Sequence, residues 1–256
     1  MAIRISAISY LNTLPFVYGL KCSSLYPNGI DLILSTPEKA ARDLINRTID
    51  IGIVPSAIIP QLGKERIISD YCIGAEGKVA SVLLCSGKPV SEIEEVFLDC
   101  ESTTSVLLAR ILFRRHWRIE PSYSLFNAGL QEIDYSLSYL LIGDKALLNG
   151  RKFKFVYDLA EEWIKFKSLP FVFACWTSNR NLSDSFKIEF NKALEFGVNN
   201  IENSISTIPL GFDYNYVLDY LTNNVSYKLT PEKREGLSEF WTLAMEELKS
   251  KVRWFG

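Results

Sequence analysis

Short apolar segments alternate with helical patterns along most of the 256 residues, and this alternation limits the fold more than any other feature. The segment 2–9 alternates like a strand and is followed by an apolar helical pattern at 13–21. The segment 30–35 is followed by a helical pattern at 36–47, in which Thr36 is a suitable N-cap residue. This repeated strand–helix order predicts an α/β fold with a largely parallel sheet.

A second series of strand and helix patterns starts after residues 87–94, where glycine, proline and charge interrupt the apolar pattern. The chain returns to an apolar strand at 169–178 and then turns mostly helical, with helices expected at 183–206, 214–223 and 231–250. We therefore expect two α/β lobes, residues 1–86 with 175–256 and residues 87–174. Segments near 84–90 and 170–176 would join the lobes as a two-strand hinge. A ligand cleft lined by strand ends would lie between the lobes, an arrangement that closes on small ligands.

The composition argues against several classes of partner. Hydrophobic residues make up 48% and charged residues 23% of the chain, as in an ordinary globular protein, and the formal net charge is -2. The one basic cluster, residues 113–118, is typical of a solvated helix face, so we expect no nucleic-acid partner. No apolar segment approaches the roughly 20 residues that span a bilayer, and residues 1–9 do not resemble a signal peptide. We expect a cytoplasmic protein with no membrane partner.

The cysteine and histidine residues exclude further kinds of site. The five cysteines are widely spaced, with no CxxC or Cys/His pairing, so zinc and redox motifs are unsupported and we expect reduced, buried thiols. The single histidine, His116, belongs to the basic cluster and is expected to be solvated, which argues against Ser–His and Cys–His catalysis. Neither a GxGxxG motif nor a P-loop is present. We therefore expect no cofactor and no bound metal.

The segment ISYLNTLPF, residues 8–16, places Ser9, Asn12 and Thr13 where a strand leads into a helix. These residue types cap helices in many proteins, which is the simpler explanation. The alternative is a ligand-binding site at the carboxyl end of a strand, where α/β proteins usually bind ligands. Residues 48–58 repeat the design, since an apolar strand there ends in Ser56, which opens a helical stretch.

The second lobe offers three further candidates. Thr103, Thr104 and Ser105 open an amphipathic helix, whose free N–H groups and partial positive charge can bind a carboxylate or phosphate. Asp144 follows an apolar strand and a glycine. For both segments, helix capping alone is the alternative. Ser81 is a lone hydroxyl in an apolar strand, where it must find a partner or face a cleft. Two anion sites on facing lobes would suit a ligand with two anionic groups.

Motifs spread over residues 3–178 resemble the menaquinone-biosynthesis family of periplasmic-binding-protein-like enzymes. They are SYLNTLPF, IDIGIVPSA, SVLLCS, STTSV, LIGDKAL, and YDLAEEW followed by LPFVFACW. The resemblance implies a type II periplasmic-binding-protein-like fold with two α/β lobes. Within the family, the chain is most similar to the members that dehydrate chorismate in the futalosine route.

The resemblance implies a hydro-lyase that converts chorismate to 3-[(1-carboxyvinyl)oxy]benzoate and water without a cofactor. Asn12 matches the polar residue that would orient the substrate near its leaving hydroxyl group. Ser81 matches a substrate-contacting serine, and Thr104 and Ser105 match the helix start that would hold a carboxylate. The remaining residues expected to bind substrate are Ser9, Ser56, Thr103 and Asp144.

One position departs from the family pattern, because many relatives have arginine where this chain has Thr103. Anion binding would then rest more on backbone N–H groups. The main rival function is a solute-binding protein that performs no chemistry, since the same fold serves both functions. A homodimer is left open.

Overall fold

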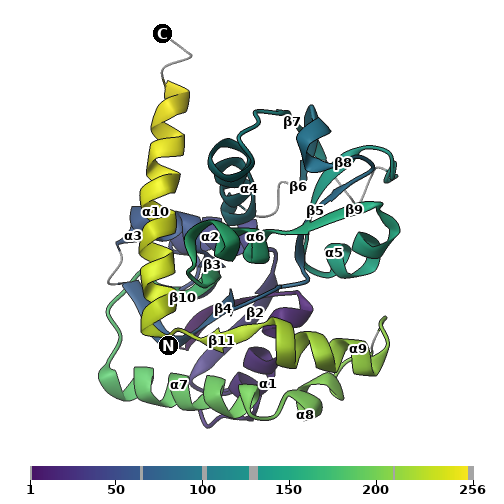
Figure 1. Ribbon diagram of the computed structural model, residues 1–256. Helices are drawn as coiled ribbons and strands as arrows, with labels where there is room; N and C mark the ends of the chain where they lie inside the picture. Colours follow the sequence, from purple (N-terminus) through teal and green to yellow (C-terminus); the bar gives the residue numbers. More distant parts are fainter. Residues whose placement is uncertain (1, 64–65, 100–102, 127–131, 210, 253–256) are drawn as a thin grey trace. The chain divides into compact units, whose positions relative to one another are not determined.

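A computed structural model describes residues 2–63, 66–99, 103–126, 132–209 and 211–252 (Figure 1). The strands of one sheet are β1 (Ile3–Ile8), β2 (Ile30–Ser35), β3 (Ile51–Pro55), β4 (Ile67–Ala75), β10 (Phe171–Ser178) and β11 (Ser226–Lys228). The strands of the other are β5 (Val82–Ser86), β6 (Glu95–Asp99), β7 (Ser122–Phe126), β8 (Ser138–Ile142) and β9 (Phe155–Asp158). The helices are α1 (Leu14–Cys22), α2 (Pro37–Ile45), α3 (Ile59–Leu62), α4 (Thr103–Ile111), α5 (Gly143–Asn149), α6 (Leu159–Lys167), α7 (Asp184–Val198), α8 (Ile201–Ile205), α9 (Tyr214–Asp219) and α10 (Pro231–Val252). No helix among the described residues is long and apolar enough to cross a membrane.

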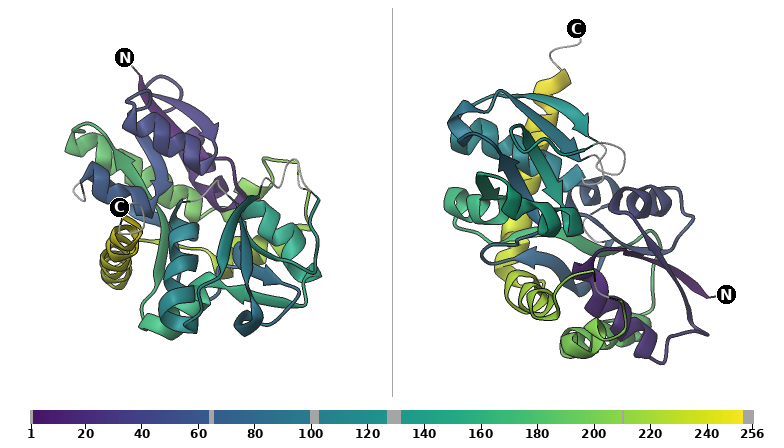
Figure 2. Two further views of the ribbon diagram at one scale, coloured as in Figure 1. Left: turned by 90° about the horizontal axis from the view of Figure 1, so that it is seen from above. Right: turned by 90° about the vertical axis from the view of Figure 1, so that its right-hand side faces the viewer.

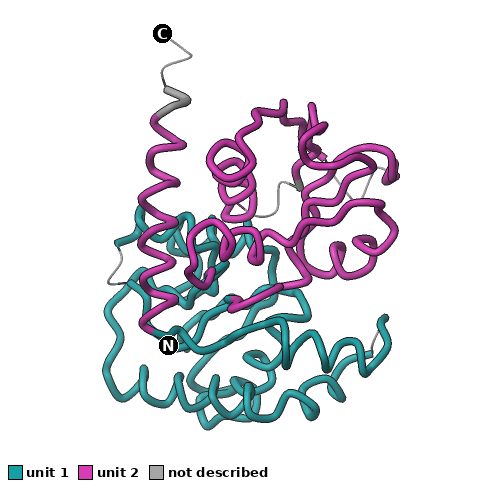
Figure 3. The backbone as a smooth tube through the Cα atoms, in the orientation of Figure 1, with its two compact units in different colours: residues 1–74, 172–230 teal, residues 75–171, 231–256 magenta. Residues whose placement is uncertain are grey.

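The chain divides into two compact units, shown in Figure 3. Unit 1 comprises residues 1–74 and 172–230, and unit 2 comprises residues 75–171 and 231–256. The lobes expected from the sequence placed residues 75–86 and the C-terminal helix in the first lobe. They lie in unit 2 because β5 pairs with β8 and β9, and α10 packs against α4. The chain passes between the units at 74–75, 171–172 and 230–231, whereas we expected two crossings.

The sheet of unit 1 has the order β11-β4-β10-β3-β1-β2. β1 is parallel to both neighbours, with Ser6 opposite Ile33 of β2 and Gly52 of β3. From β1 the chain passes through α1 to β2, which lies on one side of β1 in the sheet. It then passes through α2 to β3, which lies on the other side of β1, so the direction of the strand order reverses there. Open α/β sheets bind ligands at such a reversal, outside the carboxyl ends of the two strands. In unit 1 this point lies at the ends of β1 and β3.

The sheet of unit 2 has the order β7-β6-β8-β5-β9 and contains the same kind of reversal. β6 is parallel to β7 on one side and to β8 on the other. The chain leaves β6 through α4 to reach β7, and later enters β8, which leads into α5. The starts of α4 and α5 therefore lie at the same edge of the sheet. Several neighbours pair antiparallel, namely β10 with β3, β11 with β4, and β5 with both β8 and β9. The expectation of a largely parallel sheet is therefore wrong away from the two reversals.

Aromatic packing fixes α1 on the sheet of unit 1. The ring of Phe16 meets Tyr71 of β4, Trp176 of β10 and Tyr227 of β11 edge-on, with ring centroids 5.2–6.2 Å apart. Rings in this arrangement contribute about 0.5–1.5 kcal/mol per pair beyond the area that they bury. Because Phe16 lies in the first turn of α1, this packing also fixes the strand–helix connection that precedes it.

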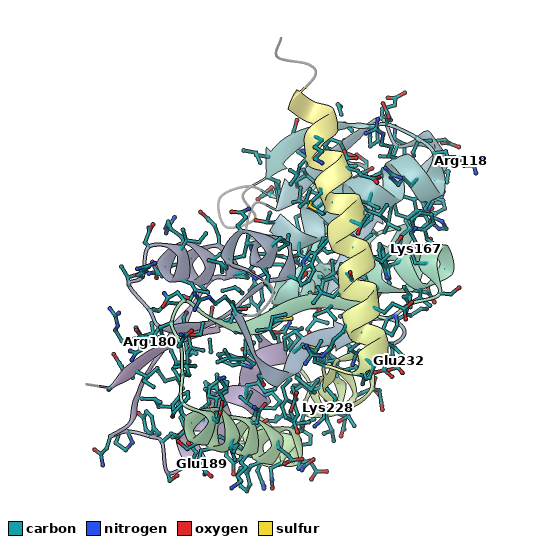
Figure 4. The ribbon with its side chains drawn as sticks, turned by 90° about the vertical axis from the view of Figure 1, so that its left-hand side faces the viewer. Arg118, Lys167, Arg180, Glu189, Lys228 and Glu232 are labelled. Carbon is teal, nitrogen blue, oxygen red and sulfur yellow. The ribbon has the colours of Figure 1, made fainter. Side chains whose placement is uncertain are left out.

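Unit 2 has a core on each face of its sheet. On the side of α5, an apolar cluster contains Leu83, Cys85, Phe126, Tyr139, Leu141, Ala146 and Phe153. On the other side, Trp163 of α6 and Phe240 of α10 both pack on Phe171, at 5.3 and 5.1 Å between ring centroids. α10 runs beside α4 in the views of Figures 1 and 2. Lys167 of α6, labelled in Figure 4, forms a 2.7 Å ion pair with Glu239 of α10.

Arg114, Arg115 and Arg118 of the basic cluster 113–118 are exposed, as expected of a solvated helix face, but residues of the cluster also pair with carboxylates. Arg114 pairs with Glu247 at 3.3 Å and Arg115 with Glu246 at 2.6 Å, so both arginines hold α10. His116 Nε2 lies 3.0 Å from the buried carboxylate of Glu162 in α6 and is only partly exposed. The cluster therefore joins elements of unit 2.

Some local predictions are confirmed by the structure and others are wrong. The N-cap at Thr36 is confirmed, since its hydroxyl accepts a 3.3 Å bond from Lys39 N. The helix expected at 231–250 is α10, but the helix expected at 183–206 is wrong because it divides into α7 and α8. The helix expected at 214–223 consists of α9 followed by a π-helical segment.

The described cysteines are mostly buried, as expected. Cys72, Cys85 and Cys175 are buried, whereas Cys22 is exposed, and Cys100 lies outside the described residues.

Candidate functional site

The strand–helix connection after β1 does not use its polar side chains as helix caps. Residues Leu11–Thr13 form a 3-10 turn before α1, and neither that turn nor α1 has a side-chain cap bond at its N-cap residue. Thr13 Oγ1 instead donates to the carbonyl of Ile8 and lies 3.0 Å from that of Tyr10. The hydroxyl group of Thr13 therefore holds the end of β1 against the turn that carries Asn12.

Asn12 is the polar residue of this turn whose role the fold does not explain. Its Oδ1 atom is buried and has no hydrogen-bond partner among the described residues. A buried carbonyl oxygen without a partner costs about 1–3 kcal/mol, and binding a ligand that donates a hydrogen bond would recover this cost. Capping, the simpler explanation of ISYLNTLPF, does not apply to Asn12, and the unpaired oxygen favours a binding role.

Ser9 and Ser56 lie at the same edge of the sheet as Asn12, after β1 and β3. Ser9 is exposed, and its N–H group donates to the carbonyl of Ser35 at 3.0 Å. Ser56 is fully buried, and its hydroxyl group donates a 2.8 Å hydrogen bond to the carbonyl of Val172. The structure thus brings all three residues to one edge, but the Ser56 hydroxyl also ties β3 to β10.

In unit 2, Ser81 and Asp144 lie next to the paired ends of β5 and β8. Val82 of β5 is opposite Ile142 of β8, and the N–H of Gly143 donates a 2.8 Å bond to the carbonyl of Ser81. Gly143 has a positive φ of 58°, which a glycine adopts without strain, and Asp144 follows it in the first turn of α5. Ile142 occupies the N-cap position without a side-chain bond, so capping does not account for Asp144. Ser81 itself is buried.

α4 starts at Thr103, at the same edge of the sheet as α5. Thr103 is exposed, whereas Thr104 and Ser105 are buried within unit 2. The expected anion site therefore offers an exposed hydroxyl group on Thr103 together with the first N–H groups of the helix, which have no intrahelical acceptor. The two residues that precede Thr103 in the motif, Glu101 and Ser102, lie outside the described residues.

Asp158 is a buried carboxylate that was not among the residues expected to bind substrate. Its Oδ1 atom caps α6 by accepting bonds from Ala160 N at 3.0 Å and Glu161 N at 3.2 Å. Its Oδ2 atom accepts a 2.7 Å bond from Ala80 N, immediately before Ser81. Burial raises the pKa of Asp158 above its ordinary value, although these backbone N–H bonds act in the opposite direction. The pattern Asp158–Glu161 signals a helix start, but nothing in the sequence indicates the contact with Ala80.

Other chemistry is sparse in the part of the chain that the structure describes. No group of three or more His, Cys, Asp or Glu residues there could hold a metal ion. Burial raises the pKa of the Cys85 thiol to about 12, so this cysteine is held in its protonated form. The polar groups available at the two sheet reversals are therefore amides, hydroxyls, backbone N–H groups and the carboxylate of Asp144.

A family model described as menaquinone biosynthesis matches residues 3–246. The chain belongs to the menaquinone biosynthesis family. A curated relative, the chorismate dehydratase of Thermus thermophilus, is 25% identical over 189 residues, which cover 67% of this chain and 68% of that protein. The resemblance identified from the motifs is thereby confirmed.

Solved structures show which fold this menaquinone biosynthesis protein has. A protein from Archaeoglobus fulgidus aligns with a TM-score of 0.73 at 16% identity, over 96% of this chain and 97% of that chain. The periplasmic aliphatic sulphonate-binding protein of Escherichia coli aligns with a TM-score of 0.58 at 17% identity, over 96% and 87% of the two chains. A Candida albicans protein described as having the generic periplasmic binding protein fold aligns at 0.55, with 13% identity over 98% and 95%. The expected α/β, periplasmic-binding-protein-like fold is confirmed.

Proposed function

We propose that this protein is a chorismate dehydratase, a hydro-lyase that converts chorismate to 3-[(1-carboxyvinyl)oxy]benzoate and water in the futalosine route of menaquinone biosynthesis. The proposal is supported by membership of the menaquinone biosynthesis family and by similarity to the Thermus thermophilus chorismate dehydratase. The observation that carries it is the buried Oδ1 atom of Asn12, unpaired among the described residues, at the sheet reversal of unit 1.

The reaction breaks the C4–O bond of chorismate and removes the proton from C3. The electron pair of the C3–H bond completes the aromatic ring, while the 4-hydroxyl group leaves and takes up a proton to become water. Because the ring becomes aromatic, the enzyme mainly has to hold the reactive conformer and exclude bulk water. We propose that the substrate's own enolpyruvyl carboxylate accepts the C3 proton and passes it to the departing hydroxyl group, so that no protein base and no cofactor is required.

Asn12 has the chemistry needed to orient the leaving group. Its unpaired amide oxygen would accept the O–H of the 4-hydroxyl group, and this bond would fix the direction of the C4–O bond relative to the ring. A neutral amide suits this role better than a carboxylate, because chorismate already carries two negative charges. The hydroxyl group of Thr13 holds the turn in place.

The substrate carboxylates need hydrogen-bond donors, and the residues expected to provide them lie in unit 2. We propose that the start of α4 binds one carboxylate through the backbone N–H groups of its first turn and the exposed Thr103 hydroxyl. Thr104 and Ser105 form the first turn that presents those N–H groups, while Ser81 and Asp144 contact the substrate from the neighbouring strand ends. Ser9, exposed beside Asn12, is a further contact in unit 1.

The test is to incubate the purified protein with chorismate, without added metal or cofactor, and to separate the products by chromatography. We expect 3-[(1-carboxyvinyl)oxy]benzoate to form, and Asn12→Asp to lower kcat about 100-fold or more, as misplacement of a reacting group does. Asn203→Asp, the same change at an exposed position, should behave like the wild type. Tight binding of chorismate without product would instead support a solute-binding protein, and no binding would reject chorismate as the ligand.

A further inference from the structure

Residues 78–80 form a short connection to β5 that is fixed at one end by helix α6. Val79 is buried, and Lys78 Nζ lies 3.8 Å from Glu161 Oε1 in the first turn of α6. The N–H of Ala80 donates its 2.7 Å bond to the buried carboxylate of Asp158. The connection is therefore attached to the start of α6 immediately before it reaches Ser81.

The backbone at Ala80 needs this attachment. Its φ is 60°, in the left-handed region that side chains other than glycine rarely adopt. A non-glycine residue stays in this conformation only where its surroundings impose it. The 2.7 Å bond from Ala80 N to the buried carboxylate of Asp158 can impose this conformation.

The conformation of Ala80 decides where Ser81 lies. Ser81 is the next residue, and its carbonyl accepts the N–H of Gly143, directly before Asp144. A change of φ at Ala80 would rotate the chain at Ser81 and disturb the contact with the start of α5. One carboxylate thus determines the position of two of the residues proposed to touch the substrate.

We infer that Asp158 is a positioning residue, which holds Ala80 in its left-handed conformation and thereby places Ser81 for substrate binding. This inference rests on the proposed function, because Ser81 is assigned to the substrate there. Asp158 does not touch the substrate and acts only through the connection 78–81. Its capping bonds to α6 serve a second purpose, since they keep the carboxylate in place.

The variant Asp158→Asn separates the two tasks of the side chain. Asparagine is as good an N-cap residue as aspartate, so its oxygen can still accept the N–H groups of α6. Its NH2 group would then face the N–H of Ala80, and two donors cannot bond to each other. Asp213→Asn is the matched control, because Asp213 caps α9 through a 3.0 Å bond from Tyr216 N and its side chain holds no second segment among the described residues.

We expect Asp158→Asn to raise the KM for chorismate about tenfold and to change kcat much less, whereas Asp213→Asn leaves both values near those of the wild type. Hydrogen–deuterium exchange of the peptide that contains Ala80 should become faster in Asp158→Asn, while exchange of the peptide that contains the centre of β8 stays slow. A merely structural role would lower the thermal unfolding midpoint without this selective rise in KM.

A second substitution tests the left-handed conformation directly. Glycine adopts positive φ freely, so Ala80→Gly in the Asp158→Asn background should recover part of the lost affinity. If the double variant is no better than Asp158→Asn, or if Asp158→Asn keeps the wild-type KM, the positioning role is overturned while the dehydratase function stands. If the wild-type protein forms no product from chorismate, the proposed function fails and this inference fails with it.

Discussion

Gly197 of α7 lies so close to α1 that a Cβ atom on this glycine would overlap the carbonyl oxygen of Pro15. Gly19 faces α7 in the same way, since its Cβ would overlap the carbonyl of Ala193. The two helices therefore cross backbone to backbone, and α1 cannot move away without losing the aromatic contacts of Phe16. Because Pro15 lies three residues after Asn12, this helix crossing also supports the candidate site.

The first prediction concerns Gly197→Ala. The added methyl group must displace α1 or α7, and overpacking of this kind costs about 1–3 kcal/mol of unfolding free energy, sometimes more. We expect urea unfolding to show this loss and the KM for chorismate to rise, since the turn at Asn12 moves with α1. Gly211→Ala is the control, because nothing lies within 4 Å of a Cβ at that position. Equal stability of the two variants would contradict the close helix crossing.

The second prediction concerns Ser56→Ala. The Ser56 hydroxyl is fully buried, and its loss leaves the carbonyl of Val172 without this donor, at a cost of about 1–3 kcal/mol. We expect the free energy of unfolding to fall by that amount and the KM for chorismate to stay unchanged, with exposed Ser24→Ala as the control. A higher KM at unchanged stability would instead support Ser56 as a substrate contact.

The strand–helix order could be predicted from the sequence because it depends on local periodicity. β1, α2 and α10 are examples, and the N-cap at Thr36 follows from a residue preference that acts over one turn. β4 was missed, since Ser69 and Asp70 interrupt its apolar run and its place in the sheet depends on β10 and β11. The break between α7 and α8 was also missed, although Asn199 and Asn200 are residues that compete with helical hydrogen bonds.

The candidate site was predictable in part, for the same reason. Residues at strand ends can be read from the sequence, and the structure places Asn12 and Asp144 at the two sheet reversals. The unpaired oxygen of Asn12 could not be foreseen, because it depends on what the rest of the fold leaves without a partner. The bond between Asp158 and Ala80 joins residues 78 positions apart, and no local pattern encodes such a pairing.

The third prediction concerns the dependence of stability on pH through Asp50. Burial alone would raise the pKa of Asp50, but hydrogen bonds from Arg4 and the charges of Arg4 and Arg180 outweigh it and lower the pKa below its ordinary value of 3.8. Below that value the folded state binds fewer protons than the unfolded state. The stabilisation by Asp50 is therefore complete above pH 3.8 and is lost as the pH falls through the lower folded-state pKa.

We expect the free energy of unfolding of Asp50→Asn to lie below that of the wild type at pH 7, with the difference shrinking as the pH falls below about 4. Denaturant titrations of both proteins between pH 7 and pH 2 measure this difference. Asp31→Asn, at an exposed position without an ion pair to any described residue, is the control and should follow the wild type at every pH. A difference that grows on acidification would contradict the lowered pKa.

The last prediction concerns Thr103, the first residue of α4. Thr103 is exposed at the start of α4, so a guanidinium group there can reach a carboxylate bound at the helix start. We expect Thr103→Arg to lower the KM for chorismate several-fold at low ionic strength, with the gain shrinking as salt screens the charge.

The same substitution should cost some stability, because a positive charge near a helix N-terminus opposes the helix dipole by about 0.3–1 kcal/mol. Thr242→Arg adds the same charge at an exposed position of α10 in the same unit and should leave the KM unchanged. If both variants lower the KM equally, the gain reflects net charge alone. A gain confined to Thr103→Arg would support binding of a substrate carboxylate at the start of α4.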